Sequence, residues 1–369
     1  MYLKTGNHKS QRVALHFHKL TVKDIQQETR DCVSIAFDIP VESVKDFLFK
    51  QGQNITIRMN MDGEQIRRSY SICSCPFDNE LRIAVKKVYD GSFSTFANQK
   101  LKRGDVLEVL PPTGTFFTEV NTSNKKKYVF FAAGSGITPV ISIIKTILRT
   151  ESESTVTLVY GNRNVASIIF KEDLDGLKDK HLQRFRVYHI LSRERTEATI
   201  NYGRIDAEKC AQLARLLDLT TIDEFFICGP EKMIFTIKEF LATYGIDKKK
   251  IHFELFTTPT RKNIKIYTAK NPQEDEGSEI TVKMDGRSFT FMLDYNSNNI
   301  LDASLAQGAD LPFACKGGVC CTCKAKLVEG EVEMEVNYGL EEEEVKAGFI
   351  LTCQSHPRSK KVIVDYDSK

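Results

Sequence analysis

The pattern of hydrophobic and polar positions changes twice along this chain. Between residues 16 and 120, short stretches alternate apolar and polar side chains, with turn residues between them. Alternation with a period of two is typical of strands that bury one face. Their regular spacing favours an antiparallel β-barrel. The expected strands are Leu20–Ile25, Val33–Phe37, Asn54–Arg58, Leu81–Val85 and Val106–Leu110. Hairpin turns are expected at Asp62-Gly63 and Asp90-Gly91, and a helix over Ser94–Gln99.

From Lys127 the pattern becomes one of continuous apolar strands separated by helical stretches. The first strand, Tyr128–Ala133, leads into a glycine-containing turn and then a helix over Val140–Arg149. Strands that are buried on both faces are apolar throughout, so this pattern predicts a doubly wound α/β domain with a parallel sheet. Further strands are expected at Thr155–Tyr160, Arg186–Leu191 and Glu224–Cys228.

A polar stretch that contains Pro and Gly precedes the C-terminal part of the chain and is typical of a linker. Beyond it, Glu279–Met284 and Ser288–Leu293 are expected to form a hairpin around Asp285-Gly286, and Lys361–Tyr366 a closing strand. This outline is typical of an α+β, β-grasp domain. We therefore predict a multidomain protein, with a barrel at 14–122, an α/β domain at 123–258, a linker at 259–278 and an α+β domain at 279–369.

Composition and charge indicate where in the cell the protein resides and how its domains differ in net charge. Of the 369 residues 41% are hydrophobic and 27% charged, which is ordinary for a globular protein. The sequence has neither a signal peptide nor a long apolar segment, so we expect a cytoplasmic protein. From Glu279 onward, ten Lys and Arg stand against fifteen Asp and Glu, whereas the rest carries 42 against 34. Either the acidic domain docks electrostatically on the basic body or on a partner, or the difference is ordinary surface variation. No nucleic-acid-binding patch is expected.

Four cysteines near the C-terminus have the plant-type spacing of a [2Fe–2S] cluster. They form C-x4-C-x2-C, followed by twenty-nine residues and a fourth cysteine. A zinc ribbon would need a second C-x2-C pair, and structural disulfides are typical of secreted proteins. The spacing therefore favours a cluster, with Cys321 as a non-ligand. The predicted ligands are Cys315, Cys320, Cys323 and Cys353.

Gly134 and Gly136 follow a predicted strand and precede a helix, where a bound pyrophosphate would meet free N–H groups and the positive end of the helix dipole. The motif is G-x-G-x-x-P, and alone it is also compatible with a structural glycine turn. Another strand ends in Cys228-Gly229-Pro230, where the glycine would let a planar ring approach the backbone.

Ser192 and Arg193 follow the strand that ends at Leu191, where an adenosine ribose would lie. A hydroxyl and a guanidinium at this place suit a 2′-phosphate better than a 2′-hydroxyl, which an acidic residue would bind. Arg163 would reinforce this site. Each arginine alone is equally compatible with an ordinary surface position.

In the predicted barrel, alternation places Arg68 and Tyr70 on one face of a strand, which gives a cation for phosphate and an aromatic plate for a ring. Some twenty residues later, the segment Gly91–Thr95 opens a helix whose amides would hold another phosphate. An ordinary barrel strand and a helix cap would look the same if each stood alone.

In this order, the motifs at Arg68–Ser71, Gly91–Ser94, Gly134–Pro139 and Cys228–Pro230 resemble the signature of the ferredoxin–NADP⁺ reductase superfamily. With the cluster module appended, the chain is most similar to reductase components of oxygenases such as the phenylacetyl-CoA epoxidase system. The resemblance implies FAD in the barrel, NADPH or NADH in the α/β domain, and the [2Fe–2S] cluster in the C-terminal domain.

The resemblance also implies a role for individual residues. Tyr70 would stack on the isoalloxazine, and Ser71 would lie near its N5. Cys228 would lie near nicotinamide C4, followed by Gly229 and Pro230. Phe256 would either cover the flavin or pack in the core, since plastid-type reductases end in tyrosine at this point. The FAD pyrophosphate would be held by Arg68, Gly91, Ser94 and Thr95, the nicotinamide nucleotide by Gly134, Gly136 and Thr138, and its 2′-phosphate by Arg163, Ser192 and Arg193.

These implications predict an NADPH-dependent oxidoreductase that passes electrons through FAD and the cluster to an external acceptor protein. The expected acceptor is an oxygenase such as phenylacetyl-CoA epoxidase. Two alternatives stay open: a steroid or alkane hydroxylase as the acceptor, or a docking module that has lost turnover.

Overall fold

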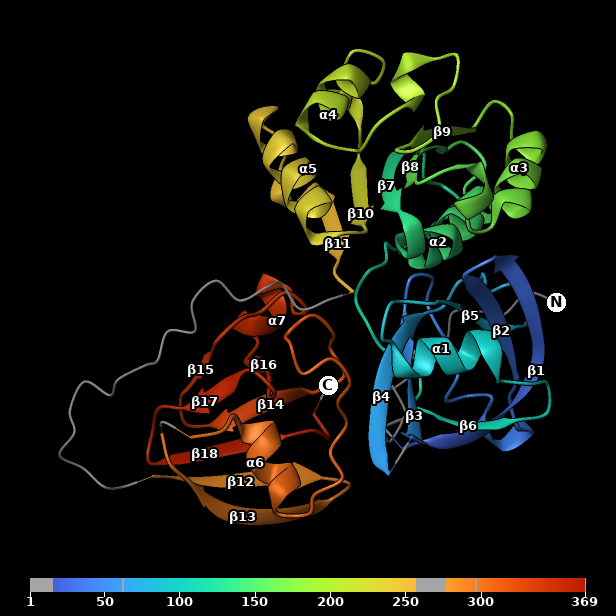
Figure 1. The fold of residues 1–369 in the computed structure, drawn as a ribbon. Helices are drawn as coiled ribbons and strands as arrows, with labels where there is room; N and C mark the ends of the chain where they lie inside the picture. The colour runs from blue at the N-terminus through green and yellow to red at the C-terminus, as the bar shows by residue number, and fades with distance from the viewer. Residues whose placement is uncertain (1–15, 62, 257–276, 296, 369) are drawn as a thin grey trace.

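The computed structural model describes residues 16–61, 63–256, 277–295 and 297–368, which form three large sheets (Figure 1). The N-terminal sheet is antiparallel, in the order β4-β3-β6-β1-β2-β5. A bridge between Ile72 and Ile83 brings its two edges together, so the predicted barrel is confirmed. Its elements are β1 (His18–Thr29), β2 (Cys32–Asp38), β3 (Asn54–Met61), β4 (Glu64–Ser71), β5 (Leu81–Lys86), α1 (Ser92–Gln99) and β6 (Val106–Val109).

One of the two predicted barrel hairpins is wrong. Met61 pairs with Glu64 across the β3–β4 turn, as expected, although Asp62 itself lies outside the described residues. Asp90-Gly91 instead leads from β5 into α1, and Gly91 is the residue that precedes the helix. Asp90 does adopt a left-handed φ of 56°, so the pair forms a tight turn, but the chain then continues into α1, and the antiparallel partner of β5 is β2.

The second sheet is fully parallel, in the order β11-β10-β7-β8-β9. Alternate residues of β7 enter two different cores: Phe130 packs with α2 on one face, and Phe131 packs with α5 on the other. This confirms the predicted doubly wound arrangement. Its elements are β7 (Lys127–Ala133), α2 (Ile137–Thr150), β8 (Thr155–Asn162), α3 (Lys171–Lys180), β9 (Phe185–Leu191), α4 (Ala207–Ala214), β10 (Glu224–Cys228), α5 (Glu231–Thr243) and β11 (Ile251–Glu254).

The C-terminal part forms a mixed sheet in the order β13-β12-β18-β14-β16, and β15 pairs with β17. The predicted hairpin is present, with left-handed φ at both Asp285 and Gly286, as a two-residue turn requires. Its elements are β12 (Ser278–Met284), β13 (Arg287–Leu293), α6 (Ile300–Ala306), β14 (Lys324–Glu329), β15 (Val332–Met334), α7 (Glu342–Lys346), β16 (Phe349–Leu351), β17 (Ser355–Pro357) and β18 (Lys361–Asp365).

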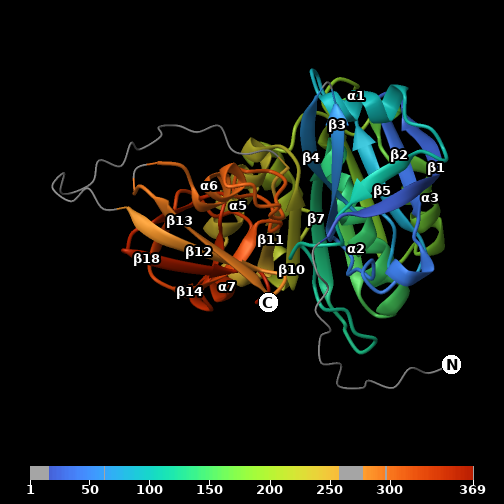
Figure 2. The ribbon, with the colours of Figure 1, turned by 90° about the horizontal axis from the view of Figure 1, so that it is seen from below.

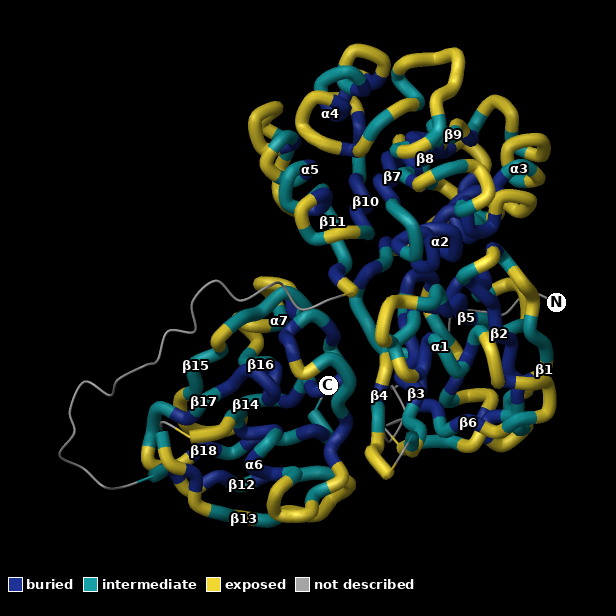
Figure 3. The backbone as a smooth tube through the Cα atoms, viewed as in Figure 1, coloured by how far each residue is buried: buried dark blue, intermediate teal, exposed yellow. Residues whose placement is uncertain are grey.

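The three parts pack against one another. Helix α2 is buried along most of its length, because one core combines its side chains with Cys73 and Phe116 of the N-terminal part (Figure 3). Val319 and Tyr338 of the C-terminal part pack on the core beneath α5. The β4 side of the barrel faces the C-terminal sheet (Figures 1 and 2). These contacts fix the relative positions of the predicted sites.

The predicted domain boundaries at 122 and 258 fall after β6 and after β11, and they stay predictions. Residues 259–276 of the predicted linker lie outside the described residues. Among the helices of the described part, none is long and apolar enough to cross a membrane.

Candidate functional site

The loop that carries three of the predicted cluster ligands lies between α6 and β14. The Cys315 sulfur interacts with those of Cys320 and Cys353, and Cys353 also interacts with Cys323. Hydrogen bonds from the neighbouring thiols, with help from the backbone N–H of Gly317, lower the pKa of Cys315. The structure thus brings all four predicted ligands together.

This arrangement fits a two-iron cluster, which shares four thiolates between two irons. Donors to sulfur are already in place: the Gly317 N–H lies 3.3 Å from Cys315 Sγ, and Gln354 Nε2 lies 3.6 Å from Cys353 Sγ. Cys321 instead donates its thiol to the Gly339 carbonyl, as expected for a non-ligand.

The flavin motif lies on β4 and at the start of α1. Tyr70 packs on Phe93 of α1, with ring centroids 5.5 Å apart. Gly91 lies close to the helix start, and a Cβ there would lie 2.4 Å from Ser94 Oγ and would displace that side chain. That hydroxyl already bonds to the Gly91 carbonyl and the Val88 amide, so Ser94 would meet a phosphate only through its backbone. The roles of Arg68, Tyr70, Ser94 and Thr95 stay predictions.

The two loops of the parallel sheet that are predicted to bind the nucleotide touch each other. A Cβ on Gly136 would lie 2.1 Å from the Cys228 carbonyl oxygen, so only glycine fits there. Gly134 adopts a left-handed φ of 54°, and Tyr160 donates a hydrogen bond to its carbonyl. Thr138 is buried, and its hydroxyl donates to the Ser135 carbonyl, so it shapes the loop. The close approach of the loops leaves the first turn of α2 next to the end of β10.

An acidic residue that none of the motifs predicted lies at this junction. The Ser71 hydroxyl donates to Glu254 Oε2 at 3.1 Å, and Glu254 lies directly opposite Cys228 in the β10–β11 pairing. Burial raises the pKa of Glu254 to about 8, and it also raises the pKa of Cys228. Ser71, Cys228 and Glu254 therefore lie together, with Ser71 and Glu254 at a cavity, and burial there favours the protonated form of the Glu254 carboxyl. Its place in the last strand beside Phe256 was the only signal that the sequence offered.

The residues predicted for a 2′-phosphate lie together at the ends of β8 and β9. The Arg193 N–H donates to the Arg163 carbonyl at 2.8 Å, and the Ser192 N–H donates to Asn162. Both arginines are exposed, and neither has an ion pair with another described residue. The adjacent Glu194 is engaged elsewhere, since its carboxylate accepts from the Val165 N–H. Two guanidinium groups available to an anion thus stand at one edge of the sheet.

A cavity of about 220 Å³ lies where the three parts of the protein meet. Phe256 is 40% exposed and lines this cavity, so it is not a core residue. Asn54 also belongs to the lining. An exposed aromatic ring beside polar side chains suits a planar, polar ligand. From β4 the lining takes Arg67, Arg68, Ser69 and Ser71, and from the cluster loop Ala314, Cys315, Val319 and Cys320.

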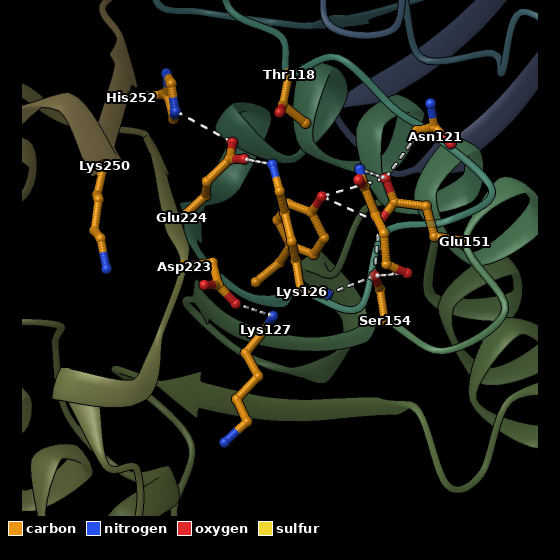
Figure 4. Close-up of polar contacts among 12 residues, drawn as sticks. Thr118, Asn121, Lys126, Lys127, Glu151, Ser154, Asp223, Glu224, Lys250 and His252 are labelled. Carbon is orange, nitrogen blue, oxygen red and sulfur yellow. Dashed lines mark hydrogen bonds and ion pairs between the residues drawn. The ribbon is translucent and has the colours of Figure 1, made fainter.

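A second group of buried carboxylates, at the opposite end of the parallel sheet, is structural (Figure 4). Burial favours protonation of Glu224, but hydrogen bonds from His252, Lys126 and Thr118 outweigh it and lower its pKa to about 2. Glu151 accepts from the Tyr128 and Ser154 hydroxyls. Each carboxylate is satisfied by neighbouring donors, so this group ties strands together.

Comparison with known proteins agrees with this geometry. Residues 19–118 match the family described as oxidoreductase FAD-binding domain, residues 130–239 the oxidoreductase NAD-binding domain, and residues 282–358 the 2Fe-2S iron-sulfur cluster binding domain. The chain is 44% identical to one of the subunits of 1,2-phenylacetyl-CoA epoxidase from Escherichia coli strain K12, over 96% of this chain and 98% of that protein.

More distant relatives share the same organisation. The ferredoxin reductase component of 3-ketosteroid-9-alpha-monooxygenase from Rhodococcus rhodochrous is 33% identical, over 94% of this chain and 96% of its own length. The solved structure of phthalate dioxygenase reductase is similar in fold, with a TM-score of 0.55 and 22% identity, and covers 95% of this chain and 98% of its own.

Proposed function

The chain belongs to the family of oxidoreductases that join FAD-binding, NAD-binding and 2Fe-2S domains as reductase components of oxygenases, and we propose that it is an NADPH-dependent reductase of an oxygenase. The observation that carries the proposal is the shared cavity, which the flavin strand β4, the end of β11 and the cluster loop line together. Such a cavity would bring the flavin ring and the cluster close to each other.

The donor sets fit these groups. FAD would be held by Arg68, Tyr70, Ser71 and the start of α1, and the cluster by Cys315, Cys320, Cys323 and Cys353. When bound, FAD accepts a hydride from the nicotinamide nucleotide and releases electrons singly, as the cluster requires. The protein supplies position and electrostatics: Gly136 lets two loops approach, and Glu254 presents a neutral carboxyl beside Ser71.

We propose NADPH as the preferred nucleotide. Ser192 and the two exposed arginines, Arg163 and Arg193, offer a hydroxyl and two cations where a 2′-phosphate would bind. NADH lacks that phosphate and would lose these contacts. Phe256 would cover the flavin, which its exposure at the cavity favours over core packing.

We propose an epoxidase of the phenylacetyl-CoA type as the acceptor, because the relative at 44% identity is a subunit of such a system. A steroid hydroxylase is the second candidate, on the strength of the relative at 33% identity. The ten cysteines are free of disulfides, and cluster ligands need reduced thiols, which supports a cytoplasmic location.

Reconstitution tests this function and its alternatives. The purified protein is mixed with NADPH and cytochrome c, and then with candidate oxygenase components and their substrates. Fast cytochrome c reduction is expected, together with product formation by the epoxidase. A protein that binds an oxygenase but reduces neither acceptor would be a docking module. Product formation only with a steroid hydroxylase would identify the second candidate.

A further inference from the structure

Arg67 joins the barrel to the C-terminal part through one buried side chain. Its guanidinium donates to the Leu311 carbonyl and to Asp310 Oδ1, both at 2.9 Å. It also lies over the ring of Phe313, at 4.1 Å from the centroid. Gln65 completes the set by accepting from Nε and Nη2. We call the contacts of Arg67 with Asp310, Leu311 and Phe313 the Arg67 clamp.

The clamp holds the backbone that leads directly into the first cluster ligand. Asp310 to Phe313 precede Cys315 by only two to five positions. Ala314 and Cys315 line the shared cavity together with Arg67 itself. Fixing Leu311 and Phe313 therefore fixes where the cluster loop begins relative to the barrel.

The strand that carries the clamp also carries the flavin motif. Successive residues of β4 point to opposite faces, so Arg67 and Arg68 project in different directions from adjacent positions. Arg67 is buried against the C-terminal part, whereas Arg68 is exposed. A single rigid strand, paired along its length with β3, thus connects the flavin site to the cluster loop.

Burial decides which contact of the clamp matters most. The Arg67 side chain is 4% exposed, whereas the Asp310 side chain is 70% exposed and is screened by solvent. The hydrogen bond to the Leu311 carbonyl is buried, and the loss of Arg67 would leave that oxygen without this donor. Arg58 also reaches Asp310, at 3.4 Å, but it is anchored mainly by Glu108. Arg67 is thus the central residue, and Asp310 contributes less.

We propose that Arg67 is a positioning residue that holds the cluster loop against the flavin site and so sets the rate of electron transfer between the two cofactors. This inference rests on the proposed function. Arg67 acts by keeping the C-terminal part docked, since the distance between the cofactors grows whenever the loop separates from β4.

The first test measures docking without turnover. Hydrogen–deuterium exchange of the backbone amides in the cluster loop is compared between the wild-type holoprotein and Arg67→Ala. Arg82→Ala is the matched control, because Arg82 is also a largely buried arginine of the barrel, paired with Asp24 and Glu80. We expect about tenfold faster exchange in the loop for Arg67→Ala and wild-type exchange there for Arg82→Ala. Unchanged exchange in Arg67→Ala would overturn the proposal.

The second test separates two kinetic steps in anaerobic stopped-flow experiments with NADPH. In Arg67→Ala, cluster reduction should slow about tenfold relative to the flavin bleaching measured in the same variant. Equal rates of cluster reduction in variant and wild type would overturn the clamp. If NADPH does not bleach the flavin of the wild type, the proposed function is wrong. The hydrogen–deuterium exchange experiment then still tests whether Arg67 holds the cluster loop.

A variant on the other side of the interface tests the Arg67 clamp even if Arg67→Ala does not fold. Asp310→Ala changes an exposed side chain and should slow cluster reduction about threefold. The double variant should be slower than Arg67→Ala only by what the 3.4 Å contact between Arg58 and Asp310 adds, because the remaining contact is shared by the two changes. Slowing by the product of the two single effects would contradict a shared clamp.

Discussion

Replacement of Arg193 by alanine is the sharpest test of nucleotide choice. Arg193 is exposed, its backbone is bonded to that of Arg163, and its guanidinium is free of ion pairs with other described residues. The 2′-phosphate of NADPH is the only part of the cofactor that NADH lacks. Removal of the guanidinium should therefore weaken the binding of NADPH and leave the binding of NADH unchanged.

The magnitude follows from the exposure of the site. A hydrogen bond to a charged group contributes ~1.5–3 kcal/mol to binding, and solvent screening favours the lower end at an exposed arginine. Arg163 remains in the variant and retains part of the attraction. We therefore expect kcat/KM for NADPH to fall about tenfold, which corresponds to about 1.4 kcal/mol. The value for NADH should stay within a factor of two, because no phosphate contact is lost.

The assay is steady-state reduction of cytochrome c at low ionic strength with each nucleotide. Arg195→Ala is the matched control: Arg195 is an exposed arginine two positions further on, and it packs over the Tyr202 ring instead. It should leave both values unchanged. If Arg193→Ala lowers kcat/KM equally for NADPH and NADH, the guanidinium does not recognise the 2′-phosphate and the assignment is refuted.

Two further predictions concern the cluster and the buried carboxyl. Cys353→Ser removes the only predicted cluster ligand that lies outside the cluster loop. Acceptor reduction should therefore be lost, while NADPH still bleaches the flavin. If the variant still reduces the acceptor, Cys353 is not a ligand. Glu254 keeps its proton up to about pH 8, whereas an unfolded glutamate ionises near its ordinary pKa of 4.5. As the pH rises between these two values, the free energy of unfolding of the wild type should therefore fall relative to that of Glu254→Gln, by at most about 1.4 kcal/mol per pH unit. If the denaturation midpoints of the two proteins instead run parallel from pH 5 to 8, the carboxyl is ionised in the folded protein.

Most of the fold could be predicted from the sequence because each part has a clear local pattern. The continuous apolar run at Tyr128–Ala133 became β7, and the alternating run at Val33–Phe37 became part of β2. The cysteine spacing predicted four ligands that the fold does bring together. The prediction at Asp90-Gly91 was wrong because the same dipeptide suits both a hairpin and a turn before a helix.

The parts of the site that depend on packing between domains could not be predicted. Glu254 meets Ser71 across 183 positions of sequence, and only the docking of β11 beside β4 brings them together. In the sequence Arg67 is an ordinary polar strand residue, and its role depends on the segment 310–313 that lies against it in the fold. Local sequence patterns fix strands and helices, whereas such contacts arise from how completed domains pack.

Cofactor analysis of the anaerobically purified protein tests the central claim most directly. We predict one FAD, two irons and two acid-labile sulfides per chain, with the flavin bleached and the cluster converted to its paramagnetic reduced form by NADPH. A colourless protein, or one that contains zinc and no labile sulfide, would contradict this electron path.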